Sequence, residues 1–414
     1  MRVLLVSQYF WPENFGINAL TLALRERGVT LTVLTGKPNY PDGSIFPGHS
    51  AWGCRREDWQ GIEVVRVPLF PRGRRSALRL VLNYLSFAAA GLFFGSWILR
   101  GRRFDAVFVY APSPLLQALP ALWLARLKRA PLALWVQDLW PESLSATGFV
   151  RNRTALALVA RVVRFIYRHT ERILVPSEGF RAPIAALADD ARKIRYYPNA
   201  WVDETAPVAA DAPVAALAAR LAAGFSVVFA GNLGTAQALD TVIDAAERLQ
   251  REGSPVRFFL IGSGSLSGWL AAEIERRGLA NVELPGRFPA AAMPVLYAAA
   301  GALLVSLRDE PIFAWTIPSK VQGYLAAGRP VIAALNGEGA RVVAAAGAGF
   351  TCPAGDAAAL ADTVRRLAAL NPGARSKMGD NARRYAAEHF ALERLATNLH
   401  VLLDEMVAVR PTDA

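Results

Sequence analysis

Residues 318–320 form the stretch whose residue types and spacing point most directly to chemistry. Pro318-Ser319-Lys320 follows a strand-like run, 302–306, and a polar loop, and it begins a predicted helix that ends at Gly328. In a parallel sheet, such a helix start suits a phosphate, because unpaired N–H groups and the positive helix end face it. Ser319 is expected to cap the helix and Lys320 to add a positive charge. The alternative is an ordinary strand-to-helix turn with a solvated lysine.

Glycine-containing loops follow two further predicted strands of the same half. Gly231-Asn232-Leu233-Gly234 comes after the strand-like run 226–230 and before a predicted helix. Glycine lets backbone N–H groups approach a phosphate, so we expect this loop and Lys320 to serve one ligand. Gly262 leaves a third strand in the same way. A contact with a base or sugar is one interpretation of Gly262, and a plain turn, which we favour, is the other.

Polar residues also follow strands in the first half. Gly16 and Asn18 come after the first predicted strand and open a helix, where a glycine can admit a phosphate or a sugar. Gln137, Asp138 and Glu142 follow the strand-like run 132–136. Asp138 would suit a general base or an acceptor of a hydroxyl hydrogen bond at a cleft edge. Capping of the following helix is the alternative for both carboxylates, and we favour it for Glu142.

Alternating strands and helices must position these loops. The predicted strands are 3–7, 30–35, 62–67, 105–110, 132–136, 172–176 and 194–197 in the first half, and 226–230, 256–261, 282–284, 302–306 and 330–334 in the second. The stretches between them have helical spacing, which predicts an α/β fold with two parallel, doubly wound sheets. A length of 414 residues also favours two domains over one core.

The predicted domain boundary lies in residues 203–224, which contain Ala, Pro and Asp and are weakly patterned. We therefore expect an N-terminal domain over 1–205 and a C-terminal domain over 206–384. Residues 385–414 would form a helical tail, part of a helix from about 383 to 406 with no strand after it.

The net charge of +12 belongs to the first half alone. Residues 1–205 hold 27 Lys and Arg against 15 Asp and Glu, whereas residues 206–414 hold 19 of each class. Uneven charge of this kind indicates an anionic partner for one half. Aromatic residues near the basic ones lie in apolar runs such as 92–94, which favours an anionic membrane surface over nucleic acid.

Residues 80–99 are long and apolar enough to span a bilayer. However, strands of one predicted sheet lie on both sides of the segment, and a single crossing would separate them. A helix or helical hairpin in the membrane interface fits better, and a fully buried core helix is the other alternative. A second basic stretch, 155–170, suits lipid headgroups and solvent equally well. The predicted membrane contacts are Arg74, Arg75, Arg79, Leu92, Phe93, Phe94, Trp97, Arg100, Arg102 and Arg103.

Missing motifs narrow the chemistry. The sequence has no GxxxxGK[ST], so ATPase chemistry is not expected. The four histidines lie apart from one another and from the cysteines, and no D-x-D triplet leaves a strand, so we expect no metal site. Cys54 and Cys352 are distant, which favours a reducing compartment. The first ten residues turn polar too soon for a signal peptide.

These residues resemble family-4 glycosyltransferases of the GT-B fold. The matching stretches run in order over nearly the whole chain: SQYFWPENFGIN, KPNYPDGSIFPG, NYLSF, VQDLWPESLSATG, YYPNAWVD, GNLGTAQALD and PSKVQGYLAAGRPVIAALNGEGA. Within the family, the chain is most similar to the bacterial branch that builds O-antigen, capsule and colanic-acid polysaccharides. That branch includes N-acetyl-L-fucosamine transferases.

The resemblance implies two Rossmann-like domains with a cleft between them. A nucleotide-sugar donor would bind the C-terminal domain and a lipid-linked acceptor the N-terminal one, with the C-terminal helix crossing back to the first domain. The implied reaction is glycosyl transfer with retention, without a metal or other cofactor. By position, Gly16 would face the diphosphate, Glu310 would lie near the donor sugar, and Ser319 and Lys320 would meet the diphosphate.

The expected site residues follow from the motifs and the resemblance together. Donor-binding residues would be Gly231, Asn232, Gly234, Gln237, Gly262, Thr316, Pro318, Ser319 and Lys320. Catalytic residues would be Asp138, Glu310 and Lys320, and the acceptor side would hold Gly16, Asn18, Gln137 and Glu142.

Three positions depart from the pattern of the family. Many members have His-Asp where this chain has Gln137-Asp138, and the usual Arg and Lys of the phosphate loop are Asn232 and Gln237 here. The usual second glutamate falls at about Gly323. Because Asn232 and Gln237 are neutral, Lys320 and helix N-termini would provide most of the diphosphate stabilisation.

The sequence therefore predicts a glycosyltransferase that moves an N-acetylated deoxyhexose or hexose from a UDP-linked donor to a glycan on a polyprenyl diphosphate. It would act in surface polysaccharide synthesis, as a peripheral or monotopic protein on the cytoplasmic face of the bacterial inner membrane. Nucleic acid is not an expected partner.

Two other classes of function are compatible with the sequence. A GT-B nucleotide-sugar epimerase would need acid–base groups but no membrane half, so residues 72–103 argue against it. A catalytically silent membrane-bound partner in a polysaccharide assembly complex is compatible with the neutral Gln137, Asn232 and Gln237. The substitution Lys320→Ala distinguishes these alternatives. It should sharply reduce turnover and donor affinity in an enzyme, whereas a silent partner should show only the small stability effect of a surface mutation.

Overall fold

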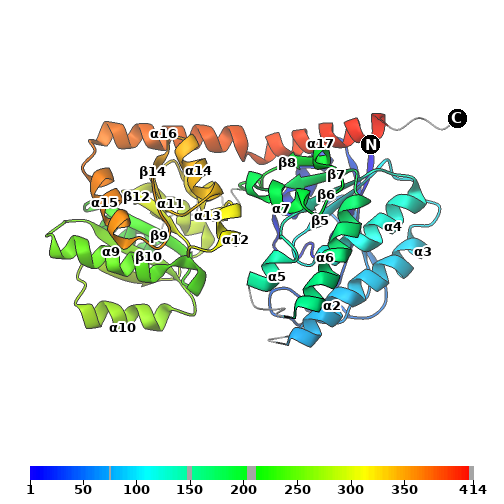
Figure 1. The fold of residues 1–414 in the computed structure, drawn as a ribbon, viewed down its shortest axis with the longest axis horizontal. Helices are drawn as coiled ribbons and strands as arrows, with labels where there is room; N and C mark the ends of the chain where they lie inside the picture. The colour runs from blue at the N-terminus through cyan, green and yellow to red at the C-terminus, as the bar shows by residue number, and fades with distance from the viewer. Residues whose placement is uncertain (74–75, 147–151, 203–210, 410–414) are drawn as a thin grey trace. The chain divides into compact units, whose positions relative to one another are not determined.

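The computed structural model describes residues 1–73, 76–146, 152–202 and 211–409, which form two compact units (Figure 1). Unit 1 combines residues 1–200 with 392–414, and unit 2 comprises Trp201–Ala391. The predicted boundaries at 205 and 384 therefore lie a few residues from the observed division.

The sheet of unit 1 has eight strands in the order β3-β4-β2-β1-β5-β6-β7-β8. Its strands are β1 Arg2–Val6, β2 Thr30–Thr35, β3 Arg55–Trp59, β4 Ile62–Arg66, β5 Ala106–Ala111, β6 Leu132–Val136, β7 Arg172–Val175 and β8 Ile194–Tyr196. All pairs are parallel except β3 with β4. Each predicted strand of this half is present, and all but the short β8 are largely buried in the sheet.

Strand β3 was not predicted, because its sequence RREDW lacks an apolar run. Such a charged strand is tolerated at a sheet edge, where one side of the backbone stays unpaired. It is held by an ion pair between Glu57 and Arg66 of β4, and the Arg66 side chain is fully buried. Arg66 also donates to the carbonyl oxygens of Gly36 and Trp11. This arginine therefore ties the edge of the sheet to the loops after β1 and β2.

Helices cover both faces of this sheet (Figure 1). The helical elements are α1 Gly16–Glu26, α2 Ala77–Ala90, η1 Gly91–Gly95, α3 Ser96–Ile98, η2 Leu115–Gln117, α4 Ala118–Lys128, α5 Glu142–Ala146, α6 Arg153–Arg168, η3 Glu178–Phe180, α7 Arg181–Ala185, η4 Ala191–Lys193 and α17 Leu392–Ala408. α1 and α17 share one core with residues such as Phe108 and Trp135 of the sheet.

The sheet of unit 2 has six parallel strands in the order β11-β10-β9-β12-β13-β14. Its strands are β9 Ser226–Asn232, β10 Arg257–Ser263, β11 Val282–Gly286, β12 Ala302–Ser306, β13 Val331–Ala334 and β14 Gly349–Cys352. Its helical elements are α8 Ala212–Ala222, η5 Thr235–Gln237, α9 Leu239–Arg251, α10 Ser267–Arg277, η6 Ala290–Ala292, α11 Met293–Ala299, α12 Pro311–Trp315, α13 Ser319–Ala327, α14 Glu338–Ala345, α15 Ala357–Ala368 and α16 Pro372–His389. The four-residue β14, at the edge, was not predicted.

The expected linker over 203–224 is wrong for its second part, which is helix α8. The Asp211 side chain caps this helix by accepting from the Val214 N–H at 3.0 Å. Alanine has the highest helix propensity, and Val214, Leu217 and Leu221 are buried against the sheet. Residues 203–210 lie outside the described residues.

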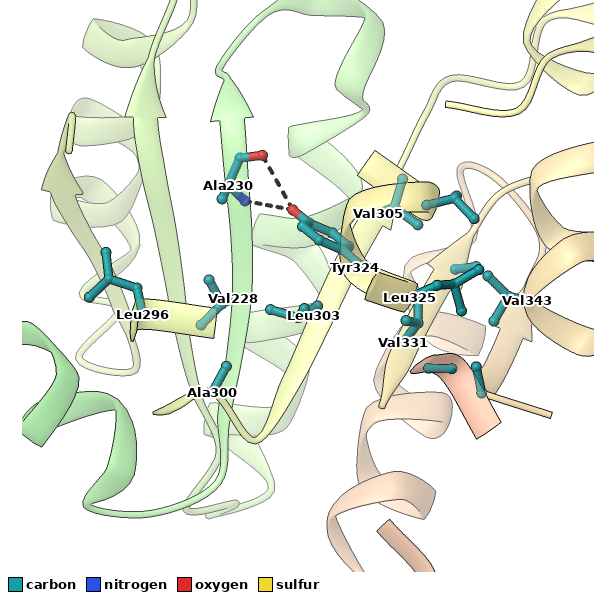
Figure 2. Close-up of a cluster of buried hydrophobic side chains, with 14 of the residues drawn as sticks. Val228, Ala230, Leu296, Ala300, Leu303, Val305, Tyr324, Leu325, Val331 and Val343 are labelled. Atoms are coloured by element: carbon teal, nitrogen blue, oxygen red, sulfur yellow. Dashed lines mark hydrogen bonds between the residues drawn. The ribbon is translucent and has the colours of Figure 1, made fainter. Parts of the chain in front are cut away.

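Two hydrophobic clusters sandwich this second sheet. One contains residues of α8, α11, α13, α14 and α16, and part of it is shown in Figure 2. The other contains residues of α9, α10 and α15. In the first cluster the hydroxyl of Tyr324 on α13 donates to the Ala230 carbonyl oxygen (3.2 Å) and accepts from its N–H (3.0 Å). This pair of hydrogen bonds fixes α13 against the end of β9.

The predicted tail helix over 383–406 is two helices instead of one. α16 ends at His389 and α17 begins at Leu392, with the fully buried Phe390 between them. α17 buries Leu395, Leu399 and Leu403 in the core of unit 1, and the Tyr197 hydroxyl donates to the Leu395 carbonyl oxygen at 2.8 Å. The break therefore divides the tail between the two units.

The apolar segment around residues 80–99 is a helix over 77–98, the one described helix long and apolar enough to cross a membrane. Only 33% of its most apolar window is buried, so the fully buried alternative is wrong. The buried side contacts the sheet: a Cβ on Gly95 would lie 3.1 Å from Leu34. Asn83 on that side accepts from Gln8 and donates to the Phe70 carbonyl oxygen, both at 2.7 Å. One side of this helix is therefore bonded to the protein.

Candidate functional site

Lys320 lies at the carboxyl edge of the sheet of unit 2, where β9 and β12 end. Its Nζ donates to Gln237 Oε1 at 2.6 Å and lies 4.8 Å from the centroid of the Phe229 ring. A Cβ on Gly231 would lie 2.9 Å from Lys320 Cε, so the lysine stem passes directly over the glycine loop. The structure therefore brings together two predicted features that are about 90 residues apart in sequence.

The Lys320 ammonium lies in a largely buried position. Burial lowers the pKa of this side chain to about 8. Within the described parts of the chain, no acidic side chain forms an ion pair with it; its partners are a neutral amide and an aromatic ring. A buried cation without a countercharge is stabilised by an arriving anion, so this position favours a negatively charged ligand.

The start of α13 differs from the prediction in one respect. Pro318 is the N-cap, and its side chain makes no capping hydrogen bond. Ser319 is the first helical residue and is exposed, so it does not cap the helix. Tyr324, one turn after Lys320, anchors the same helix to Ala230. The lysine is thus held by the helix, while the positive helix end stays open to a ligand.

Gly231 and Gly262 are required by the close approach of β9 and β10. They are partners in the parallel register and have φ angles of 137° and 140°. A Cβ on Gly262 would lie 1.9 Å from the Gly231 carbonyl oxygen. Gly262 is therefore part of a strand end, where the Gly231 backbone leaves no room for a side chain.

The remaining donor-side predictions are placed around this edge. Asn232 folds over Gly234, where a Cβ would meet its Nδ2 at 2.7 Å. The Thr316 hydroxyl donates to the Phe313 carbonyl oxygen within its own turn. Glu310 is exposed and immediately precedes α12. Gln237 accepts the hydrogen bond from Lys320 and so orients the ammonium.

A pocket of about 540 Å³ opens beside the glycine loop, at the ends of β9, β10 and β11. Three of the predicted ligand-binding residues line this pocket: Gly231, Asn232 and Gly262. Sequence reasoning missed other residues of its wall, which include Arg287, Phe288, Met293 and Tyr297. Residues 287–288 directly follow β11, so their position after a parallel strand could have indicated them.

The first predicted loop of unit 1 is held by a buried glutamate. Glu13 accepts from the N–H groups of Asn39 (2.8 Å), Tyr40 (2.7 Å) and Phe10 (3.2 Å), and burial raises its pKa to about 7. Asn18 accepts from the Trp11 N–H and donates to the Glu13 carbonyl oxygen. Asn18 thus supports the loop.

Gly16, the first residue of α1, lies at an open position in that loop. A Cβ there would meet no atom within 4 Å. The neighbouring rings of Tyr9, Phe15 and Tyr40 pack together, with centroids 5.2–5.7 Å apart. The aromatic cluster therefore fixes a loop whose glycine stays accessible.

Gln137 and Asp138 follow β6 at the carboxyl edge of the sheet of unit 1. The Gln137 Nε2 and the Tyr167 hydroxyl are buried and, within the described residues, have no hydrogen-bond partner. Burial, with Glu142 and Asp138 nearby, raises the pKa of Tyr167. Glu142 is the first residue of α5, where its carboxylate complements the helix N-terminus. Polar groups without partners beside Asp138 are suited to a ligand that supplies hydrogen bonds.

The predicted membrane contacts separate into exposed and engaged residues. Phe93 and Trp97 are 76% and 61% exposed, Phe94 is exposed, and Leu92 is half-buried. Arg79, Arg100 and Arg103 are also exposed. Arg102 departs from the prediction: it pairs with Glu63 at 2.5 Å and donates to Thr32 Oγ1. Arg74 and Arg75 lie outside the described residues.

Among the residues that the structure describes, no group of three or more His, Cys, Asp or Glu side chains is placed to hold a metal ion.

Comparison with known proteins gives a match for each unit. Residues 224–369 match the family model "Glycosyl transferases group 1", and residues 16–200 match "Glycosyl transferase 4-like domain". The chain is 26% identical over 339 residues to the putative colanic acid biosynthesis glycosyl transferase WcaI of Escherichia coli (strain K12), covering 79% of this chain and 82% of that protein. It is 28% identical over 347 residues to the probable glycosyltransferase WbjE of Pseudomonas aeruginosa, covering 81% and 84%.

A solved structure has the same fold. Anabaena HepE, in complex with UDP and glucose, superposes with a TM-score of 0.66 over 98% of this chain and 100% of that one, at 17% identity.

Proposed function

Because this chain belongs to the family-4 glycosyltransferases and has the GT-B fold, we propose that it transfers a sugar from a UDP-linked donor to a glycan on a polyprenyl diphosphate. The reaction would serve bacterial surface polysaccharide synthesis, in line with the name of the Escherichia coli relative, a putative colanic acid biosynthesis glycosyl transferase. The sugar would be an N-acetylated deoxyhexose or a hexose, transferred with retention and without a metal ion. The site of action would be the cytoplasmic face of the inner membrane.

The observation that carries the proposal is the environment of Lys320. Its ammonium is partly buried, lacks an ion pair with any described acidic residue and lies against the loop of Gly231. A nucleoside diphosphate would supply the missing negative charge. As the glycosidic bond to the diphosphate breaks, charge grows on the leaving oxygens, and a fixed ammonium and helix end stabilise that charge more than they stabilise the ground state.

The pocket beside the glycine loop fits the nucleoside of such a donor. Its volume of about 540 Å³ lies in the range of small-ligand sites, and its walls combine Phe288 and Tyr297 with the backbone of Gly231 and Gly262. We propose that the base and ribose occupy this pocket and that the diphosphate extends toward Lys320. HepE, which shares the fold, binds UDP.

Acceptor binding would use the polar residues after β6. Asp138 would accept a hydrogen bond from, or deprotonate, the attacking hydroxyl, and Gln137 Nε2 would donate to the acceptor glycan. The Gln137 Nε2, which has no hydrogen-bond partner among the residues that the structure describes, supports this assignment.

Binding of UDP in the presence of EDTA tests the donor site and its pH dependence. We expect UDP to bind more tightly than GDP or dTDP, with an affinity about tenfold lower at pH 9 than at pH 7. A group with a pKa of about 8 loses about nine-tenths of its charge over that interval, and the ammonium is the form that binds the diphosphate. Isothermal titration calorimetry with the full chain measures both results.

The Lys320→Met variant is the control for this pH series. It keeps the apolar stem over Phe229 but removes the charge, so its weaker UDP affinity should not change with pH beyond any titration of the nucleotide itself. If none of the nucleotides binds to the parent protein, the donor-site proposal is wrong. If binding requires a divalent cation, the metal-independent mechanism is wrong.

Association with a membrane would use the exposed apolar side of the 77–98 helix. Substituting Phe93→Ser and Trp97→Ser together should lower partitioning onto phosphatidylglycerol-containing vesicles by about tenfold or more, because burying one aromatic side chain is worth about 1.5–3 kcal/mol. Vesicle flotation measures the partitioning. Raised salt should weaken it further, because the first half is basic.

A matched control is Trp52→Ser, which alters a tryptophan that is 70% exposed in another part of unit 1. It should leave partitioning unchanged. Equal flotation of the double variant and the parent would exclude the helix as the membrane contact.

A further inference from the structure

Unit 1 contains a groove that the proposed reaction does not use. It has a volume of about 810 Å³ and lies between η1, α4 and α6. Its floor and walls include Leu92 from η1, Leu119 and Leu122 from α4, and Phe165 from α6. Apolar side chains from three separate elements therefore line one open space.

The groove lies at the opposite edge of the sheet from the proposed acceptor residues. Arg129 and Ala130, which line it, lead into the amino end of β6, whereas Gln137 and Asp138 follow the carboxyl end. A strand of five residues spans about 17 Å. A ligand in the groove is thus separate from the reacting hydroxyl.

The groove is continuous with the apolar side of the 77–98 helix. Leu92 lines the groove, while its neighbour Phe93 is exposed. The Trp123 Nε1 on α4 donates to Ser96 Oγ on α3 at 3.1 Å, which fixes this half-exposed ring at the rim. An indole with an apolar face and one polar bond is typical of the membrane interface.

Positive charge lies at the same rim. Arg126 and Arg129 line the groove and are exposed, and neither forms an ion pair with an acidic residue in the described ranges. The acidic residue that lines the groove, Glu171, accepts from the Leu132 N–H at 2.9 Å and so faces the backbone. The rim therefore presents net positive charge beside an apolar space.

We propose that this groove holds one hydrocarbon chain of an anionic membrane phospholipid, with Arg126 and Arg129 against its phosphate. The inference rests on the proposed membrane association and goes beyond it. A surface helix inserts only among headgroups and upper acyl segments, whereas a chain drawn into the groove would fix unit 1 to a single lipid in one orientation. A neutral apolar helix of another protein would leave the two arginines without countercharge.

Calorimetric titration of the full chain with n-decyl phosphate, below its critical micelle concentration, tests the groove without a bilayer. We expect one saturable site. Leu122→Trp, which fills the groove, should weaken binding at least tenfold. Arg126→Glu together with Arg129→Glu should weaken n-decyl phosphate binding to a similar extent but leave the binding of neutral decyl maltoside nearly unchanged.

Phe93→Ser is the matched control, because it alters the exposed helix outside the groove and should not change amphiphile binding. Thermal unfolding verifies that the Leu122→Trp variant is folded. The charge-reversal variant tests ligand binding in the groove without adding a bulky side chain there. Non-saturable binding, or equal binding by the parent and both variants, would overturn the inference.

The groove proposal and the membrane-association proposal can be rejected separately. Saturable binding of n-decyl phosphate by a protein that does not float with vesicles would support the groove and reject membrane association. Flotation of the parent without any amphiphile binding would do the reverse, and it would leave the groove to an apolar partner helix.

Discussion

Replacing Lys320 by alanine should lower kcat/KM for the nucleotide sugar by about 100-fold and UDP affinity by about tenfold. The Lys320 stem lies directly against the glycine loop, and Asn232 and Gln237 beside it are neutral. Removal of a preorganised group that stabilises developing charge costs about 100- to 1,000-fold in kcat. Release of UDP from the donor selected by the nucleotide titrations, with a lipid-linked acceptor, measures turnover.

Two variants separate loss of charge from loss of structure. Lys320→Met preserves packing over Phe229 and should be as defective as Lys320→Ala. Lys377→Ala removes an exposed lysine from α16 and should leave turnover and affinity unchanged. If Lys320→Ala retained turnover within threefold of the parent, Lys320 would have no part in the diphosphate site.

The substitution Gly262→Ala should lower the melting temperature of unit 2 by about 6–12 °C and abolish measurable UDP binding. The new Cβ would lie 1.9 Å from the Gly231 carbonyl oxygen, at a φ of 140° that L-residues rarely adopt. Strain and overpacking of this kind cost about 3 kcal/mol or more, and about 2–4 °C corresponds to each kcal/mol in a domain of this size. The strand ends must separate, which moves the glycine loop away from Lys320.

Gly268→Ala provides the control for this substitution. Gly268 lies in the first turn of α10, and a Cβ there would meet no atom within 4 Å. Alanine should stabilise the helix by up to about 1 kcal/mol, so the melting temperature should hold or rise. Differential scanning calorimetry resolves both changes. A Gly262→Ala protein that melts within 2 °C of the parent would show that the strand ends tolerate a side chain.

The sequence was sufficient for most of the fold, because short apolar runs, such as 132–136 and 302–306, mark buried parallel strands directly. Prediction from the sequence failed for elements whose formation depends on tertiary contacts. β3 is charged and exists because Arg66 pairs with Glu57 from inside the sheet. The break at Phe390 in the C-terminal tail depends on which core receives each helix, and local periodicity does not contain that information.

For the candidate site, sequence reasoning located the loops but not the state of their side chains. The buried environment of Lys320 depends on Phe229 and Gln237, which are far away in sequence. Ser319 was expected to cap α13 from composition alone, yet Pro318 occupies that position. Arg102 was assigned to the membrane for its charge, whereas Glu63 and Thr32 hold it against the protein. Long-range partners decided each case.

Because the C-terminal tail divides at residues 390–391, the two units become complete in a fixed order during synthesis. Unit 2 is encoded entirely between the two segments of unit 1, so all of its strands leave the ribosome before α17. Unit 1 then waits for Leu395, Leu399 and Leu403 to cover the core that α1 begins. Because domains fold as units during translation, unit 2 can be complete while that apolar side of unit 1 is still open. The nascent chain therefore passes through a stage at which this apolar surface is exposed.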